Sequence, residues 1–581
     1  MLESGLRPAQ AYNLMSHEAG GIQSVGHTLT DHLNYISRKK MKEIEGGDAQ
    51  NVIDNLYQRQ QKDQDHFFRF KLGGGDKGNK LTAIFWRDSQ MMEDYKIYGD
   101  VIVFDTTFRT NKYNLICAPI VGINNHWQNV MFGCAFIANE TQETFEWVLN
   151  TFKKSMGGLD PISIFTDQDL AMSKAIQKVL PNTRHRLCIW HLIKNAVSRF
   201  GALKKDPEFK KVFNKCLRGC ITPEEFEQCW EKMIKDYKLK QSKWFNRLYK
   251  LKNKWCTALS KDFFSAGILS SQRSESTNNA VGFKARKSTS LTDFFKIFDN
   301  TIQRWRKNEA NADFRCANSK PSSNLPMCGI LKHASEIYTQ TLFREIETEF
   351  SHGLKCLTKC IDEVGSAFMY EVWIEENEKS KQLVSFDMTN NTIECSCKNF
   401  QEVGWLCYHC FRVFFIHSVN RIPDKYIYKR WTKLAKAEYW KRREETTTKS
   451  EAQQQKYMPW RTVMARKSYN LILKSQAYQE TRRLLEVKYN DIAKEIEQVI
   501  LNKISEEAQE PQQTIDNEEH QMNIPVVEDP ERANTKGRSK RIKGFFEKGK
   551  QPKQKKTKAM TVQGEGIEYG TITPIQKPTL F

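Results

Sequence analysis

The cysteine-rich segment from Glu394 to Cys410 is the clearest candidate site for chemistry in the 581-residue sequence. One residue separates Cys395 from Cys397, one separates Cys407 from His409, and nine residues separate the two pairs. Three thiolates and one imidazole suit tetrahedral Zn²⁺, and a closed set of four protein ligands is typical of structural zinc. The spacing therefore predicts a structural zinc site.

The unit that precedes this segment is predicted to be small, with two strands over 367–374 and 382–388. We expect so small a unit to lack a substantial core, so that metal binding supplies most of its folding free energy. Cys410 is an alternative ligand, although as the next helical residue it is expected to face the core. Other close pairs lack further ligands and are predicted to be structural: Cys188 with His191, Cys216 with Cys220, and Cys356 with Cys360.

Acidic residues form a second candidate site, whose members are far apart in the sequence: Asp105, Asp167 and Glu275. Three converging carboxylates can hold two Mg²⁺ ions about 3.5–4 Å apart for in-line phosphoryl transfer. Without metal the carboxylates would repel one another, and the pKa of at least one would rise. Asp169 is an alternative to Asp167, and ordinary polar residues at strand ends are the alternative to the whole site.

A mixed sheet is the element that must bring these acids together. Short apolar runs predict strands, and helical spacing predicts helices between them: strands 100–108, 115–123, 129–137 and 161–165, and helices 141–154 and 170–179. Three strands, a helix, a strand and a helix is the order of a ribonuclease-H-like domain. The first and fourth strands are neighbours in that fold, so Asp105 and Asp167 are expected at one edge of the sheet.

Two further regions flank this pattern. A hairpin is predicted before it, with strands at 67–72 and 81–86 joined by a glycine-rich turn. Residues 192–265 are basic and poor in strand patterns, which predicts a helical insertion that returns to the core near Glu275. Its aromatic residues at helical intervals are predicted to form its core: Phe213, Phe226, Trp230, Trp244 and Trp255.

Charge and composition narrow the class of partner. Lys and Arg number 90 against 69 Asp and Glu, giving a net charge of +21 and a pI near 9.2, which favours a polyanionic partner such as nucleic acid. We expect no membrane segment and no secretion signal, because no apolar run is long enough and the N-terminus lacks the required pattern. Fifteen cysteines indicate free thiols and metal ligands rather than a secreted disulfide framework.

The C-terminal part is predicted to be a helix at 465–504 followed by a disordered tail. Leu485, Ile492 and Val499 recur every seven residues and suit a partner helix, although the run is short for a coiled coil. Residues 506–531 hold nine acidic and no basic residues, whereas 532–558 hold twelve Lys or Arg and one acid. The basic run is predicted to contact phosphates and to direct nuclear import through Lys536, Arg538, Lys540, Arg541, Lys543, Lys553, Lys555 and Lys556.

Several motifs occur in an order that resembles a known family. They are FDTTF around Asp105, FTDQD around Asp167, LCIWH around Cys188, QRSES around Glu275, and the CSC…CYH finger. This order resembles that of Mutator-like transposases. It is more closely similar to the plant far-red impaired response family, transcription regulators derived from those transposases.

The resemblance implies an α/β (α+β) protein: a ribonuclease-H-like transposase core with an all-helical insertion, a small ββα zinc finger of the SWIM type, and a helical and disordered C-terminal region. It matches Asp105, Asp167 and Glu275 to the ancestral acidic triad. It also matches Cys395, Cys397, Cys407 and His409 to the ligands of structural Zn²⁺, with Mg²⁺ at the triad only if the protein is active.

The expected organisation follows from the same resemblance. The predicted parts are a helical linker at 1–65, a transposase-like domain at 66–300 with its insertion at 192–265, a helical linker at 301–365, the zinc finger at 366–418, a helical segment at 465–504, and an acidic then basic tail at 505–581. Family members usually begin with an N-terminal zinc-binding domain that recognises DNA. This sequence is expected to start in the linker that follows it.

Three functions remain as alternatives. The favoured one is a nuclear, non-enzymatic transcription regulator that binds double-stranded DNA, forms homo- or hetero-oligomers with related proteins, and takes no small-molecule substrate. The resemblance implies light signalling or developmental control for it. The second is an active transposase that cleaves and joins DNA by two-metal chemistry, since all three acidic positions hold carboxylates. The third is a protein-interaction factor without DNA contact.

Overall fold

The computed structural model describes residues 8–43, 46–73, 79–106, 111–199, 206–220, 222–268, 288–375, 377–437, 478–507 and 527–530, with isolated positions between these ranges. The chain divides into two units, residues 1–533 and 534–581, and the second lies wholly outside the described residues. No helix within the described ranges combines the length and apolar character needed to cross a membrane.

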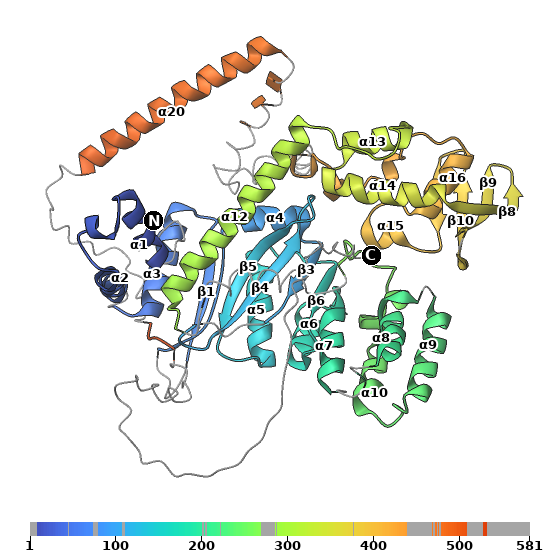
Figure 1. Cartoon of the computed structure of the whole chain (residues 1–581), viewed down its shortest axis with the longest axis horizontal. Helices are drawn as coiled ribbons and strands as arrows, with labels where there is room; N and C mark the ends of the chain where they lie inside the picture. The colour runs from blue at the N-terminus through green and yellow to red at the C-terminus, as the bar shows by residue number, and fades with distance from the viewer. Residues whose placement is uncertain are drawn as a thin grey trace, which may run out of the picture. The chain divides into compact units, whose positions relative to one another are not determined.

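A seven-stranded mixed sheet forms the centre of the first unit, in the order β1-β2-β5-β4-β3-β6-β7 (Figure 1). Its strands are β1 (Phe67–Leu72), β2 (Leu81–Arg87), β3 (Val101–Phe104), β4 (Ile116–Ile123), β5 (Asn129–Ile137), β6 (Ser163–Thr166) and β7 (Arg184–Leu187). Antiparallel pairing joins β1 to β2, β2 to β5, β5 to β4 and β4 to β3, while β3, β6 and β7 are parallel. The predicted ribonuclease-H-like order of strands is confirmed.

Helices cover both faces of this sheet because its central strands are apolar on both sides. On one face lie α3 (Asp48–Lys62) and α12 (Leu291–Asn318), whose Phe295 ring packs 4.3 Å from that of Trp86. On the other lie α4 (Ser89–Tyr98), α5 (Gln142–Ser155) and α6 (Leu170–Val179). Residues 301–365 are largely helical, as predicted, but they are not a separate linker, since α12 and the helices that follow it are part of the core.

The basic region after β7 is helical, as predicted. It contains α7 (Ile189–Arg199), α8 (Pro207–Asn214), α9 (Pro223–Asp236) and α10 (Lys243–Lys250). The predicted aromatics pack together in a core of their own, in which Trp255 is fully buried and Trp244 is partly exposed. The aromatic side chains therefore stabilise the insertion rather than form a stacking surface.

The zinc-finger region is larger than predicted. Two helices, α13 (Gly329–Ile337) and α14 (Gln340–Leu354), lead into a four-stranded sheet of β8 (Cys356–Val364), β9 (Ala367–Ile374), β10 (Asn377–Asp387) and β11 (Thr392–Cys395), followed by α15 (Asn399–Val403) and α16 (Tyr408–Ile416). Two strands were missed, β8 and β11. Buried residues such as Phe386 and Phe414 join the same apolar cluster as the large sheet, so the unit has a substantial core, contrary to expectation.

The described N-terminal residues are helical, and a helix overlaps the predicted segment 465–504, whereas the predicted tail differs in one place. The chain begins with α1 (Pro8–Glu18) and α2 (Leu29–Glu43), and α20 (Gln479–Glu507) is a long helix with an exposed apolar stripe. The prediction of a disordered tail is wrong for residues 527–530. Val527 is 2% exposed, and Glu528 forms a parallel bridge with Lys80.

Candidate zinc centre and acidic sheet edge

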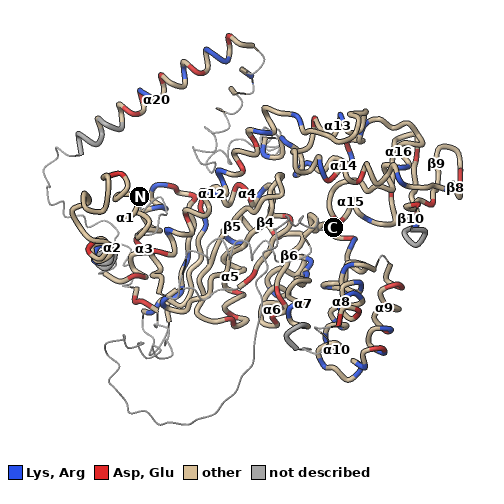
Figure 2. The backbone as a smooth tube through the Cα atoms, viewed as in Figure 1, with Lys and Arg blue, Asp and Glu red and all other residues tan. Residues whose placement is uncertain are grey.

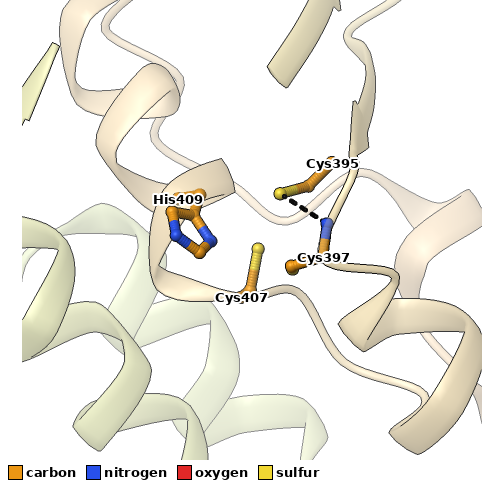
Figure 3. A group of neighbouring side chains, drawn as sticks. All are labelled: Cys395, Cys397, Cys407 and His409. Atoms are coloured by element: carbon orange, nitrogen blue, oxygen red, sulfur yellow. Dashed lines mark hydrogen bonds between the residues drawn. The ribbon is translucent and has the colours of Figure 1, made fainter. Parts of the chain in front are cut away.

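The four predicted zinc ligands lie together (Figure 3). Cys395 ends β11, and Cys397 follows in a turn where Lys398 adopts a left-handed conformation with φ of +59°. Cys407 occupies the N-cap of α16 and His409 its first turn. One side-chain donor atom from each of the four residues lies within 4.8 Å of the others. The end of β11 and the start of α16 thus bring the two pairs of predicted ligands together.

The chemistry of this cluster fits a zinc ion. His409 is 3% exposed, and neither of its ring nitrogens has a hydrogen-bond partner among the described residues. Burying an imidazole with both nitrogens unsatisfied is costly, whereas a metal ion would take the lone pair of one of them. The backbone N–H of Cys397 also donates to the Cys395 sulfur at 3.5 Å, a contact that stabilises a thiolate.

Cys410 remains close to this cluster rather than pointing away from it. Its sulfur lies 3.5 Å from that of Cys407, and both residues line a small cavity together with Cys395 and Tyr426. A fourth sulfur, and thus a fifth possible ligand, is therefore within reach of the site. The alternative in which Cys410 replaces a ligand stays open on this geometry.

A neighbouring helix holds the start of α16 in place. The backbone N–H of Tyr408 donates to Oε2 of Glu349 on α14 at 2.7 Å. Burial raises the pKa of Glu349 to about 6. A carboxylate at a helix N-terminus satisfies an otherwise unpaired N–H and interacts favourably with the helix dipole. Glu349 therefore positions the helix that carries His409.

The acidic residues Asp105 and Asp167 follow two adjacent parallel strands. Val103 on β3 pairs with Phe165 on β6, and each acid lies two residues beyond its member of that pair. The expectation that strands β3 and β6 are neighbours is confirmed. Asp105 is fully buried. Burial raises the pKa of Asp167 to about 6, and the charges of Asp169 and Glu140 add to the effect.

The alternative acid, Asp169, caps a helix. Its Oδ1 accepts the backbone N–H of Met172 at 2.7 Å and so caps the N-terminus of α6. The same backbone turn directs the N–H of Asp169 to Oδ1 of Asp167 at 3.0 Å. This favours Asp167 over Asp169 as the acid available at the sheet edge.

Sequence reasoning missed another acid at this edge, Glu140. Its Oε1 accepts the hydroxyl of Thr106, next to Asp105, at 2.8 Å, and its charge helps to raise the pKa of Asp167. Glu140 follows β5, which runs in the same direction as β3 because both are antiparallel to β4. Its position could have been found by tracing alternating strand directions through the predicted strands 100–108, 115–123 and 129–137.

The pair Cys188 and His191 also lies at this edge, where β7 leads into α7. The backbone N–H of Cys188 donates to the carbonyl of Thr166 at 2.8 Å, and the N–H of His191 donates to the Cys188 sulfur at 3.4 Å. This close local packing is consistent with the structural role predicted for the pair.

A polar chain connects the helical insertion to the same place. Lys254 Nζ lies 3.1 Å from Nδ1 of His185, and Nε2 of His185 lies 2.8 Å from the hydroxyl of Thr166, which donates to the carbonyl of Asp167. Burial, together with the charge of Lys254, lowers the pKa of His185 to about 3, so the ring is neutral. These residues tie the insertion to the backbone that carries Asp167.

Some predicted residues cannot be placed. Glu275 lies outside the described residues, so the third member of the triad stays a prediction. The same holds for the basic residues predicted for nuclear import and phosphate contact: Lys536, Arg538, Lys540, Arg541, Lys543, Lys553, Lys555 and Lys556.

Two family models match the parts of the chain just described. The MULE transposase domain matches residues 101–195, and the SWIM zinc finger matches residues 370–416. With the sheet order and the Cys₃His cluster, these matches define the chain as a transposase-like core joined to a SWIM zinc finger.

Whole-chain comparison identifies the family. Protein FAR1-RELATED SEQUENCE 5 of Arabidopsis thaliana is 33% identical over 75% of this chain and 55% of its own length. Protein FAR-RED IMPAIRED RESPONSE 1 of the same plant is 31% identical over 74% of this chain and 52% of its own. The chain belongs to the FAR1-related family, as the sequence motifs predicted. It spans about half the length of these relatives.

Proposed function

We propose that this chain acts in the nucleus as a DNA-associated transcription regulator derived from a transposase. In this proposal the ribonuclease-H-like core and its helical insertion contact double-stranded DNA, while zinc maintains the SWIM unit. The names of its Arabidopsis relatives refer to far-red impaired response, and we extend the proposal to light-signalling or developmental control on that ground.

The charge of the helical insertion is the observation that supports DNA contact most directly. Residues 192–265 contain 18 Lys and Arg against eight Asp and Glu, a net charge of +10. On α10, Lys243, Arg247 and Lys250 are all exposed, whereas Phe245 and Leu248 on the opposite face are buried. Lys and Arg positions recur along the backbone of this part of the chain, coloured blue in Figure 2. A rigid helix with one basic face suits the phosphate backbone.

Binding of duplex DNA by the full chain, measured by fluorescence anisotropy across a salt series, tests this proposal. We expect affinity to fall steeply with salt. The triple variant K243Q/R247Q/K250Q should bind more weakly and lose about one unit of the log–log salt slope for each phosphate contact removed. The matched control is R483Q/K488Q/K494Q, which removes three exposed cations from α20 and should leave the slope unchanged.

Two outcomes would contradict this assignment. A protein with no salt-dependent affinity for duplex DNA would favour the protein-interaction factor instead. Equal losses in the two triple variants would show that total charge, rather than the α10 face, determines binding.

Nuclear import is a separate part of the proposal and has its own test. The basic residues from Lys536 to Lys556 are proposed as the import signal. A fluorescent fusion that lacks residues 532–558 should lose nuclear accumulation, whereas one that lacks the acidic stretch 508–526 should keep it. Unchanged accumulation after deletion of the basic run would refute this role.

An active transposase is the second candidate, favoured by one observation. Asp105 and Asp167 follow adjacent parallel strands, and Glu140 lies at the same edge. Such carboxylates would bind Mg²⁺ for strand cleavage if the third acid joins them. The assay is Mg²⁺-dependent nicking of duplex DNA by the full chain and by Asp105→Asn, a nearly isosteric change. Activity lost in the variant would support catalysis, and equal activity in both would eliminate the triad mechanism.

A further inference from the structure

Two cysteines from neighbouring helices of the insertion, Cys216 and Cys229, lie side by side at a distance from the zinc centre in the sequence. Cys216 belongs to the short π-helical turn Lys215–Gly219 that follows α8, and Cys229 belongs to α9. The Cys216 thiol donates to the Cys229 sulfur, and the two sulfurs are 3.4 Å apart. The residues are 13 positions apart in the sequence, so close spacing did not pair them.

Several contacts hold the two segments at this separation. The backbone N–H of Cys220 donates to the carbonyl of Lys215 at 3.0 Å, which closes the π-helical turn. Nζ of Lys215 lies 2.8 Å from Oε1 of Glu225 on α9. The Cys256 sulfur lies 3.7 Å from the carbonyl of Cys216 on the same turn. The sulfur pair is therefore fixed from both helices, in a type of turn that is frequent at functional sites.

Access distinguishes this pair from Cys117 and Cys134, whose sulfurs lie 3.6 Å apart in the large sheet. Both members of the sheet pair are buried. Cys216 is buried as well, but Cys229 is partly exposed on α9. Since the backbone of a helix is largely covered by its side chains, this exposure belongs mainly to the short thiol side chain. A small reagent can therefore reach the insertion pair through Cys229.

We propose that Cys216 and Cys229 form a reversible disulfide by exchange with a small-molecule disulfide. The Cys229 thiolate attacks one sulfur of the small disulfide, whose S–S bond breaks, and the leaving thiolate takes up the proton that Cys229 lost. Cys216 then loses its proton and attacks the Cys229 sulfur, and the second small thiol leaves with that proton. Two protein thiols are oxidised by two electrons in total, and one small disulfide is reduced to two thiols.

The geometry and the burial of the pair suit this order of steps. A disulfide bond is about 2.05 Å long, so the two sulfurs must approach by about 1.4 Å. Burial raises the pKa of the Cys216 thiol, which makes it a poor first nucleophile, whereas in the second step its target sulfur is already in contact. The bond would tie α9 to the turn after α8. In reducing compartments such disulfides are usually transient and serve redox sensing.

The first experiment uses the full-length wild-type protein with zinc bound. It is treated with oxidised glutathione, quenched with acid, alkylated in denaturant, and digested without reduction for mass spectrometry. We expect the link between Cys216 and Cys229 to form first and to be reversed by reduced glutathione. The control link between Cys117 and Cys134 should form at least about tenfold more slowly, because neither sulfur is accessible. Equal rates for the two links, or a glutathione adduct on Cys229 that never gives way to the link, would overturn the proposal.

The second experiment tests the order of the two steps. Cys216→Ala should keep a stable glutathione adduct on Cys229, because the second thiol is absent. Cys229→Ser should leave the buried Cys216 unmodified, because the accessible thiol is absent. Loss of the adduct in the first variant, or modification of Cys216 in the second at the wild-type rate, would refute the proposal. If a variant unfolds, the buried Cys117 and Cys134 will react as well, and the wild-type comparison then decides.

Discussion

Single residues near the zinc centre adopt backbone conformations that few residue types tolerate. Gly404 ends α15 with φ of +89°, and a Cβ built there would lie 2.8 Å from Nε1 of Trp431. That indole N–H donates to the carbonyl of Val403 at 2.8 Å, so it cannot move without losing a partly buried hydrogen bond. Both the positive φ and the contact therefore require glycine at this position.

Substitution of this glycine gives a first prediction. Gly404→Ala should lower the free energy of unfolding by about 1–3 kcal/mol, because it adds backbone strain and displaces Trp431. Chemical denaturation of the zinc-loaded protein measures the change. The control is Gly365→Ala, where φ is +61° but no atom lies within 4 Å of the added Cβ. Equal losses in the two variants would show that the Trp431 contact contributes nothing.

His126, in the turn between β4 and β5, is buried, and its Nε2 lies 2.7 Å from Oδ1 of the half-exposed Asp313 on α12, which gives a prediction about pH. Since its folded pKa of about 9 lies above the ordinary value of 6.5, its contribution to stability is complete below about pH 6.5 and is lost as the pH rises through about 9. At about 1.36 kcal/mol per pKa unit the loss is at most about 3 kcal/mol, and screening at the half-exposed Asp313 reduces it. Denaturation midpoints at pH 6 and 9.5 should therefore converge in His126→Gln. If the two midpoints differ as much in His126→Gln as in the wild-type protein, the raised pKa of His126 is not the cause of the pH dependence.

At the scale of elements, a short piece of the C-terminal region completes a helix near the other end of the chain. The N-cap of α3 is Gly47, which has no side chain to accept the first N–H groups. Oδ1 of Asp529 accepts the N–H of Ala49 at 2.9 Å, and its Oδ2 accepts the hydroxyl of Tyr113 at 2.6 Å. Asp529 thus supplies from a distant segment the cap that α3 lacks.

Removal of this cap is the third prediction. Asp529→Ala should cost about 0.5–2 kcal/mol of stability and increase amide exchange in the first turn of α3. Asp529→Asn keeps an oxygen acceptor and should retain most of the protection. Glu528→Ala is a further control, since that side chain is exposed and its backbone makes the bridge to Lys80. Identical exchange in wild type and Asp529→Ala would show that the segment does not cap α3.

The same elements show what sequence patterns could predict. The boundaries of β5, Asn129–Ile137, were predicted because an uninterrupted apolar run marks a strand buried on both faces. β8 was missed because most of its residues are exposed and charged ones interrupt its pattern. Residues 527–530 were missed because a four-residue contact inside an acidic stretch has no periodicity. Glu140 was missed because its place at the sheet edge depends on the direction of β5, which the spacing of residues alone does not encode.

At the scale of the whole first unit, a buried ionic segment joins the zinc-binding region to the large sheet. Arg430, 5% exposed, lies 3.1 Å from Oδ2 of Asp100 and donates to the carbonyl of Ile123 at 2.9 Å. Burial raises the pKa of Asp100 to about 6 in spite of the Arg430 charge. Trp431 is fully buried beside these groups and joins the apolar cluster that contains both regions. The zinc site is therefore continuous with the ribonuclease-H-like core.

Removal of zinc should therefore destabilise structure outside the zinc finger as well as within it. A chelator should raise amide exchange at 393–416 and also in the turn at 124–128, because Asn125 donates to the carbonyl of Thr432 and Arg430 holds the end of β4. His409→Ala should reproduce this pattern without chelator. Arg430→Met should reduce the spread, since it removes the ionic connection but leaves the Asn125–Thr432 hydrogen bond, although leaving Asp100 unpaired costs about 3–5 kcal/mol. Exchange confined to the finger in the wild-type protein would show that the two regions unfold independently.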